Sequence, residues 1–187
     1  MDELRALGLR TVPVTVIGDR KILGFNPKQL YEALQFDTKV TSRDSVETIP
    51  LLGRALEAVR RAIAQMPNEK LDWTAPDRDR PMREFGYHIF MMVQKAIIQA
   101  NLRIRDIGKY ATAYDGVGRT YASFQGIADY GASVIEEYQS WVVRGGFGAL
   151  CDLPSDGADF VSADDLLDVV TGHTIHHLRQ IYFGLEH

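Results

Sequence analysis

Cysteine is almost absent from this chain, because Cys151 is the only one among 187 residues. A single thiol excludes an internal disulfide and a Cys-x-x-Cys redox pair. Its neighbours Asp152, Asp156 and Asp159 supply no cation that would lower the thiol pKa, so Cys151 is not favoured as a nucleophile. A serine nucleophile is not indicated either, since no serine lies in a Gly-x-Ser-x-Gly turn.

Positive charge and long apolar runs are also scarce. The chain has 21 Lys and Arg against 25 Asp and Glu, for a formal net charge of -4. With its basic residues dispersed, the chain is not expected to bind nucleic acid. No stretch approaches 18 apolar residues, and residues 1–4 lack the cationic-then-apolar start of a signal peptide. We therefore expect a cytoplasmic protein without a membrane partner.

Four long segments place hydrophobic residues three and four positions apart, which is the spacing of one buried helix face. They cover residues 43–66, about 81–107, about 119–142, and a last segment capped by Ser162. Four helices of this length predict a mainly α fold built as a four-helix bundle. The predicted inner stripes are Leu52, Ala55, Leu56, Val59, Ala62, Ile63 and Met66 in the first helix; Phe85, His88, Ile89, Met92 and Ala96 in the second; Phe124, Ile127, Ala128, Gly131, Ile135, Tyr138 and Val142 in the third; and Leu166, Val170, His173, His177 and Ile181 in the fourth.

The first part of the chain differs in kind. Residues 11–17 are rich in β-branched side chains, residues 18–19 form a turn, residues 21–24 suit a second short strand, and Asn26-Pro27 opens a helix. The sequence thus predicts a small β-hairpin plus helix appendage at residues 1–37, ahead of a bundle at residues 38–184. Residues 185–187 resemble the stub of an expression tag.

Three histidines fall on the predicted inner stripes: His88 in the second helix, and His173 and His177 in the last. The later two are four residues apart, which places them on one face of a helix. Imidazole is the commonest metal-binding side chain, and three of them leave a divalent ion with open positions for chemistry. His176 points about 100° away from His177, at the edge of such a site. Gln180, seven residues after His173, lies on the same face and could bond a ligand or a water.

Each histidine also has a simpler interpretation. His88 alone is typical of a core histidine bonded to a backbone carbonyl, and His-x-x-x-His patterns occur by chance. Packed together without a metal, however, neutral imidazoles would leave donors or acceptors unpaired at a cost of about 1–3 kcal/mol each. The three together favour a metal, and three imidazoles suit zinc, nickel, iron or copper.

The N-terminal segment resembles the second half of a glutaredoxin-like thioredoxin fold. The likeness rests on Thr11-Val12-Pro13, Gly18-Asp19 and Gly24-Phe25, which match that family in order and spacing. The first strand and the Cys-x-x-Cys helix start are missing, so redox catalysis is excluded. What the resemblance still implies is docking of a low-molecular-weight thiol such as glutathione by Thr11, Val12 and Pro13. A strand that lacks its usual neighbour leaves an open edge, which predicts a homodimer or a covering bundle.

The larger part, about residues 40–184, resembles the DinB/YfiT-like superfamily of four-helix metalloenzymes. The likeness rests on the helix order, a histidine after Arg83-Glu84-Phe85, and the His-x-x-His-His pattern of residues 173–177. It implies a divalent metal, often zinc or nickel, on His88, His173 and His177. Characterised relatives are transferases or isomerases that use low-molecular-weight thiols.

Taken together, these observations predict a metal-dependent enzyme that joins a low-molecular-weight thiol to a small-molecule substrate, as a transferase or an isomerase. His176 is its candidate proton carrier, and the glycine-rich residues 144–162 are expected to help close the site. One alternative is a dimeric bundle whose metal has no catalytic role. Another is a hydrolase that uses the same three histidines, and it would differ by needing no thiol.

Overall fold

The computed structural model describes residues 14–23, 27–35, 45–75, 80–102, 116–146 and 163–186. The chain divides into two compact units, residues 1–42 and 43–187. Several predictions fall outside the described residues, and they stay predictions: the thiol-docking triplet at residues 11–13, the surroundings of Cys151, the Ser162 cap and most of the proposed closing segment.

The smaller unit contains the expected hairpin and helix. Strands β1 (Val14–Ile17) and β2 (Arg20–Leu23) pair antiparallel, with Val14 opposite Leu23. Gly18 takes the turn between them with a φ of +58°, a left-handed conformation that glycine adopts without steric cost. Helix α2 (Pro27–Ala33) begins at a proline, whose fixed φ suits a first helical turn. The β-hairpin and helix predicted from the sequence are confirmed.

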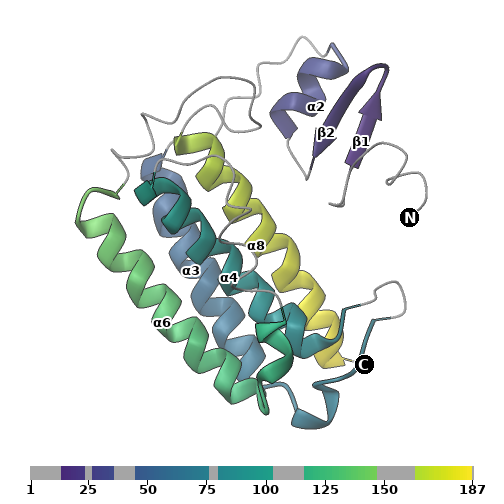
Figure 1. Cartoon of the computed structure of the whole chain (residues 1–187), viewed down its shortest axis with the longest axis vertical. Helices are drawn as coiled ribbons and strands as arrows, with labels where there is room; N and C mark the ends of the chain where they lie inside the picture. Colours follow the sequence, from purple (N-terminus) through teal and green to yellow (C-terminus); the bar gives the residue numbers. More distant parts are fainter. Residues whose placement is uncertain are drawn as a thin grey trace. The chain divides into compact units, whose positions relative to one another are not determined.

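The larger unit contains four long helices among the described residues (Figure 1): α3 (Ser45–Ala64), α4 (Met82–Leu102), α6 (Phe124–Val143) and α8 (Ala163–Glu186). Two short 3-10 helices, η1 (Asn68–Lys70) and η3 (Val117–Thr120), lie between them. Helix α3 packs against α6 and α8, and α4 packs against the same two helices from the other side. The predicted mainly α fold with a four-helix bundle is confirmed.

One end of the bundle is held together by polar contacts to the segment after α3. The Met82 and Arg83 amides at the start of α4 donate to the Trp73 and Leu71 carbonyls, at 2.9 and 3.0 Å. The first amide of α6 donates to the side chain of Asn68 at 3.0 Å. Lys70 donates its ammonium to the Gly184 carbonyl near the end of α8 at 2.8 Å. This segment therefore fixes the start of α4 relative to the last turns of α8.

The predicted start of the third helix, at about residue 119, is wrong. The chain first forms η3, and α6 begins only at Phe124. The reason is local, because Ser123 is extended and its hydroxyl accepts the Gly126 amide at 3.1 Å, which is a helix N-cap. The break leaves η3 as a separate turn that packs on α4.

The buried residues of α4 differ from those of its predicted inner stripe. Met92 and Ala96 are only partly buried, whereas Phe90, Val93 and Ile97 are almost wholly buried. The prediction followed the face that carries His88, but α4 packs against α6 as well as α8 and needs a second apolar face. By contrast, every residue predicted for the inner stripe of α3 is buried.

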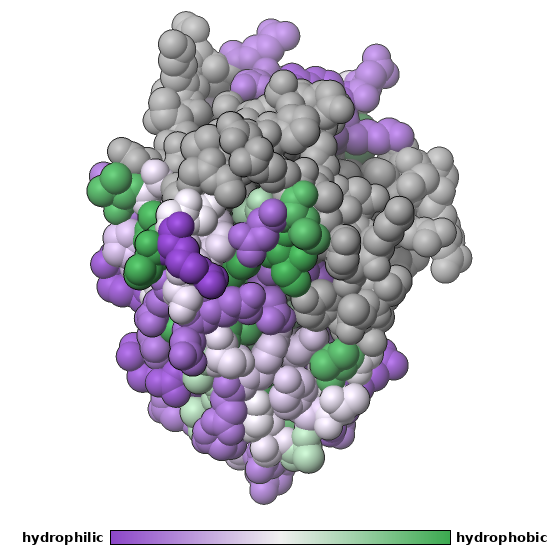
Figure 2. Space-filling model, turned by 60° about the vertical axis from the view of Figure 1, so that its left-hand side comes forward, coloured by the Kyte–Doolittle hydropathy of each residue, from purple (hydrophilic) through white to green (hydrophobic). Residues whose placement is uncertain are grey.

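No helix in the described part of the chain is long and apolar enough to cross a membrane. On the face shown in Figure 2, hydrophobic surface is divided into separate patches with polar residues between them. The apolar residues of the bundle are therefore gathered mainly in its interior, where α3, α4, α6 and α8 meet.

Candidate metal centre

The three predicted histidines meet between two helices. His88 comes from α4, and His173 and His177 come from α8. The candidate ligand nitrogens of all three lie within 4.8 Å of one another. The ring centroids are 4.2 Å apart for His173 and His177, and 5.1 and 5.7 Å from His88 to each of them. The structure thus brings together one histidine and a pair that are more than 80 residues apart in the sequence.

The hydrogen bonds within the cluster set the tautomers of its rings. Nδ1 of His177 lies 2.6 Å from Oε1 of Gln180, an atom that only accepts, so Nδ1 carries the proton. Nε2 of His177 is then an acceptor, and Nε2 of His173 donates to it at 2.9 Å. Gln180 therefore selects the tautomer of His177 in which Nε2 is available to a metal.

The helix around the pair is built to hold it. His173 and His177 are one turn apart, and Thr174 between them is fully buried. The Thr174 hydroxyl donates to the Val170 carbonyl at 2.9 Å, so it needs no partner from the cluster. On the α4 side, the Phe85 ring meets the His177 ring edge to face at a centroid distance of 4.9 Å. Packing from both helices thus limits how the two imidazoles can turn.

Burial keeps His88 and His173 uncharged. Together with the positive charge of Arg80 and the neighbouring histidines, it lowers the pKa of His88 to about 2 and that of His173 to about 3. Neutral imidazole is the form that binds a metal. These two histidines are therefore in their ligand form throughout the neutral range.

The residues present fit a divalent ion. They offer three imidazole nitrogens, and Nδ1 of His173 is a buried ring nitrogen that forms no hydrogen bond. An unpaired buried polar atom is costly, and a cluster that holds a ligand is one setting in which it is tolerated. Tetrahedral metal–nitrogen bonds of about 2.0–2.1 Å place the ligand nitrogens about 3.3 Å apart, a distance between the 2.9 Å of the His173–His177 pair and the 4.8 Å limit of the whole group.

Two other predicted residues lie beside the cluster. Gln180 contacts His177 as described above, which is the position of an outer partner of a ligand. His176 is exposed, and its ring centroid lies 5.4 Å from that of His177, outside the group of three. The geometry gives His176 access to solvent and to one side of the cluster.

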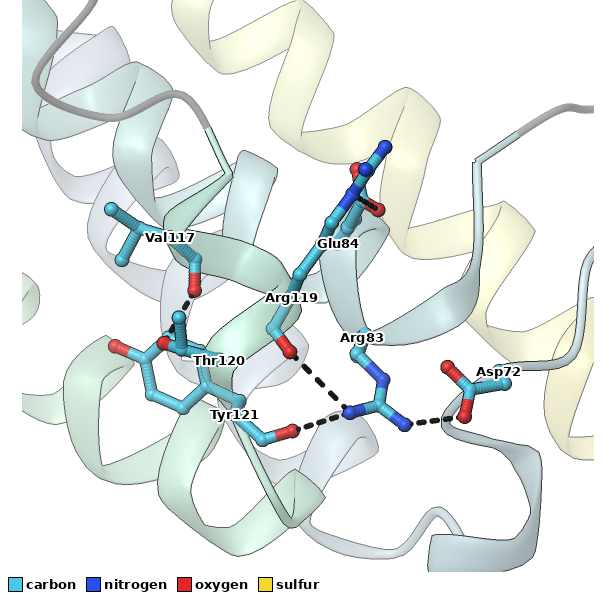
Figure 3. Close-up of polar contacts among 7 residues, drawn as sticks. All are labelled: Asp72, Arg83, Glu84, Val117, Arg119, Thr120 and Tyr121. Atoms are coloured by element: carbon cyan, nitrogen blue, oxygen red, sulfur yellow. Dashed lines mark hydrogen bonds and ion pairs between the residues drawn. The ribbon is translucent and has the colours of Figure 1, made fainter.

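A polar network at the start of α4 was not predicted from the sequence (Figure 3). Arg83 donates to the Asp72 carboxylate and to the carbonyls of Tyr121 and Arg119, the Tyr121 contact being 3.0 Å. Arg119 from η3 donates through Nε to Glu84 at 2.6 Å. The sequence signal was present as Arg83-Glu84, but its partners lie 11 and 35 residues away along the chain.

This network surrounds an open pocket of about 410 Å³, lined by Asp72, Pro81, Arg83, Glu84 and Arg119. The volume lies within the range of small-molecule sites, about 300–1,000 Å³. Gly118, next to the pocket residue Arg119, allows η3 to approach α4 closely. A Cβ at this position would lie 3.0 Å from the Glu84 Cα and 3.1 Å from Cδ1 of Tyr87. A larger residue would not fit between η3 and α4 as they stand.

These features define a class of protein, namely helical bundles that present one histidine from an early helix and two from a late helix at a common point. A model of the DinB superfamily matches residues 51–181, and the chain belongs to the DinB superfamily. No curated protein and no solved structure matches the chain significantly. The predicted resemblance to this superfamily is confirmed over residues 51–181, while the glutaredoxin-like resemblance of the first residues stays a prediction.

Proposed function

We propose that the protein holds one divalent metal on His88, His173 and His177 and uses it to join a low-molecular-weight thiol to a small electrophile, as a transferase or an isomerase. The observation that carries the proposal is the meeting of three imidazoles, one of which has its tautomer fixed by Gln180. Membership of the DinB superfamily supports a metal at this place.

When bound, a divalent ion lowers the pKa of a thiol or water on it and polarises a carbonyl, which supplies a nucleophile at neutral pH. The chain itself provides the remaining parts. Three ligands leave open positions, whereas a structural zinc site is usually closed by four protein ligands. Gln180 orients His177. His176, exposed beside the cluster, would take up the proton that a thiol releases.

Zinc and nickel are the metals we propose, because three nitrogen ligands without a thiolate or carboxylate suit both ions. The described residues contribute no fourth cysteine, aspartate or glutamate to the cluster. A thiol or water can therefore occupy a position on the metal.

The first experiment is elemental analysis of the untagged protein after reconstitution with zinc or nickel, beside His173→Ala and His176→Ala. We expect about one ion per chain in the wild type and in His176→Ala, and a loss of at least tenfold in occupancy in His173→Ala. Full occupancy in His173→Ala would refute the ligand set. Metal-loaded protein is then assayed against electrophiles with and without glutathione or cysteine. Turnover that needs no thiol would indicate the hydrolase, and no turnover at all would favour the non-catalytic bundle.

We also propose that the chain forms a homodimer through its N-terminal unit. Among the described strands β1 pairs only with β2, so its other edge is available to a third strand. The proposal would be refuted by the mass of a single chain in light scattering at micromolar concentration.

Docking of the thiol by Thr11, Val12 and Pro13 is a further proposal, and a substitution of Pro13 that leaves thiol affinity unchanged would refute it.

A further inference from the structure

The charged pocket at the start of α4 is lined by two closed ion pairs (Figure 3). Arg83 donates to the Asp72 carboxylate, and Arg119 donates to Glu84 through Nε at 2.6 Å. Pro81, the fifth lining residue, carries no charge. The lining therefore has no net charge, and it favours neither a simple anion nor a simple cation. A ligand that carries both signs, by contrast, would find a partner for each of them.

Both ion pairs keep hydrogen-bonding groups that the pairing does not use. Arg119 contacts Glu84 through Nε alone, so its two Nη groups form no hydrogen bond with the described part of the chain. Oε2 of Glu84 and Oδ1 of Asp72 also have no hydrogen bond there, because each pair engages only one carboxylate oxygen. The pocket thus presents donors on a cation and acceptors on two anions while both ion pairs stay closed.

Each ion pair joins a mostly buried side chain to an exposed one. The Arg83 side chain is 19% exposed and that of its partner Asp72 is 79% exposed, while Glu84 is 21% and Arg119 75% exposed. The two buried members are neighbours at the start of α4, whereas the exposed members come from the turn after η1 and from η3. A buried partner therefore holds each exposed group at the pocket, with its unused atoms accessible to a ligand.

We propose that the charged pocket binds the head group of a free α-amino acid, with Arg119 donating to its carboxylate, and Asp72 and Glu84 accepting from its ammonium. An α-amino acid carries both charges on one carbon, and the Arg119–Glu84 pair brings opposite charges within 2.6 Å. A guanidinium matches a carboxylate in geometry, and an ammonium supplies three donors to carboxylate oxygens. Ligand and lining are each neutral overall, so the complex leaves no charge without a partner. The inference does not depend on a metal at the three histidines.

The test is a titration of full-length protein labelled with ¹⁵N, at pH 7, followed by amide shifts in two-dimensional NMR spectra. The probes are L-norvaline, pentanoate, which lacks the ammonium, and butan-1-amine, which lacks the carboxylate. We expect norvaline to bind about five- to tenfold more tightly than either analogue, because each analogue loses one charge-assisted contact. Pentanoate that binds as tightly as norvaline would indicate an anion site and overturn the inference, as would the absence of saturable norvaline binding.

Variants then assign the binding to the pocket. Arg119→Gln and Asp72→Asn each remove one charge from an exposed side chain, and each should weaken norvaline binding about five- to tenfold. Arg119→Lys keeps the charge and should retain part of the affinity. Arg144→Gln is the matched control, because this exposed arginine follows α6, about 30 Å along that helix from η3. Norvaline affinity that is unchanged in both charge-removing variants, each with the wild-type pattern of amide signals, would overturn the inference.

Discussion

The two faces of α4 differ in the chemistry of the side chains that they carry. The face toward α6 carries Phe90, whose ring lies where a Cβ on Gly131 would stand, 2.4 Å from Cζ. That face is mainly apolar and tightly packed, and its polar residue Gln94 is hydrogen-bonded to Tyr130 and Glu137 of α6. The face toward α8 carries His88 next to two imidazoles of α8, and one of these, His173, has a buried ring nitrogen without a hydrogen bond. On its α6 side α4 is therefore held by packing and hydrogen bonds, whereas on its α8 side it meets a buried polar atom without a hydrogen bond.

This difference separates contacts that stabilise the bundle from contacts that a bound ligand would explain. An apolar contact needs nothing more once it is packed, whereas a buried imidazole must find a partner or cost free energy. The contacts of α4 with α6 are explained by stability. The imidazoles between α4 and α8 would be explained by the metal that we propose there.

The largest effects are expected from one substitution on each face of α4. Phe90→Ala leaves a cavity against α6 and is expected to lower the free energy of unfolding by about 3–5 kcal/mol, while metal binding at pH 7 stays near one ion per chain. His88→Leu is expected to abolish metal binding, yet to change the stability of metal-free protein by less than about 1 kcal/mol. Urea unfolding and elemental analysis measure both effects. Loss of metal in folded Phe90→Ala would contradict this division.

Lowering the pH is expected to destabilise the metal-free protein through the histidines between α4 and α8. The pKa values of His88 and His173 are about 2 and about 3 in the folded protein, against 6.5 for a free histidine. Below pH 6.5 the unfolded chain binds protons that the folded chain refuses, so the stabilisation present above pH 6.5 is lost as pH falls. Between pH 7 and pH 5 the two groups are expected to remove roughly 2–4 kcal/mol from metal-free protein.

The control for this effect is His88→Leu, in which about half of the pH dependence should disappear because one of the two groups is gone. Urea unfolding of metal-free protein at several pH values gives both curves. Parallel curves for wild type and variant would show that His88 is not held neutral by burial.

The smallest expected effect belongs to Gln180. Gln180→Leu removes the acceptor that fixes the tautomer of His177, and should weaken metal affinity by about 10–100-fold without abolishing binding. Gln139→Leu, at an exposed position of α6, is the matched control. Competition with a coloured chelator measures the affinities. An unchanged affinity in Gln180→Leu would mean that packing by Phe85 alone orients the imidazole.

The sequence predicted those parts of the structure that depend on local periodicity. The inner face of α3 follows from its 3–4 residue spacing, and the meeting of His88 with His173 and His177 follows from placing each on an inner stripe. The second buried face of α4 was not predicted, because Phe90 and Val93 lie outside the single stripe of 3–4 residue spacing assigned to this helix. Only the position of α6 reveals that they are buried.

The charged pocket was missed for a related reason. Arg83 and Glu84 look like an ordinary solvated pair at the start of a helix, and charges are common there. Their partners Asp72 and Arg119 come from segments that are joined only when the bundle closes. The start of α6 was also predicted wrongly, although Ser123, three residues before Gly126, was a recognisable capping residue.

Gly118 controls how closely η3 approaches α4. Because a Cβ there would lie 3.0 Å from the Cα of Glu84, the absence of a side chain allows the two elements to pack together. Alanine at this position would push η3 and its Arg119 away from α4, and so widen the pocket that Arg119 lines with Arg83 and Glu84. One position outside the pocket lining thus sets the width of the pocket.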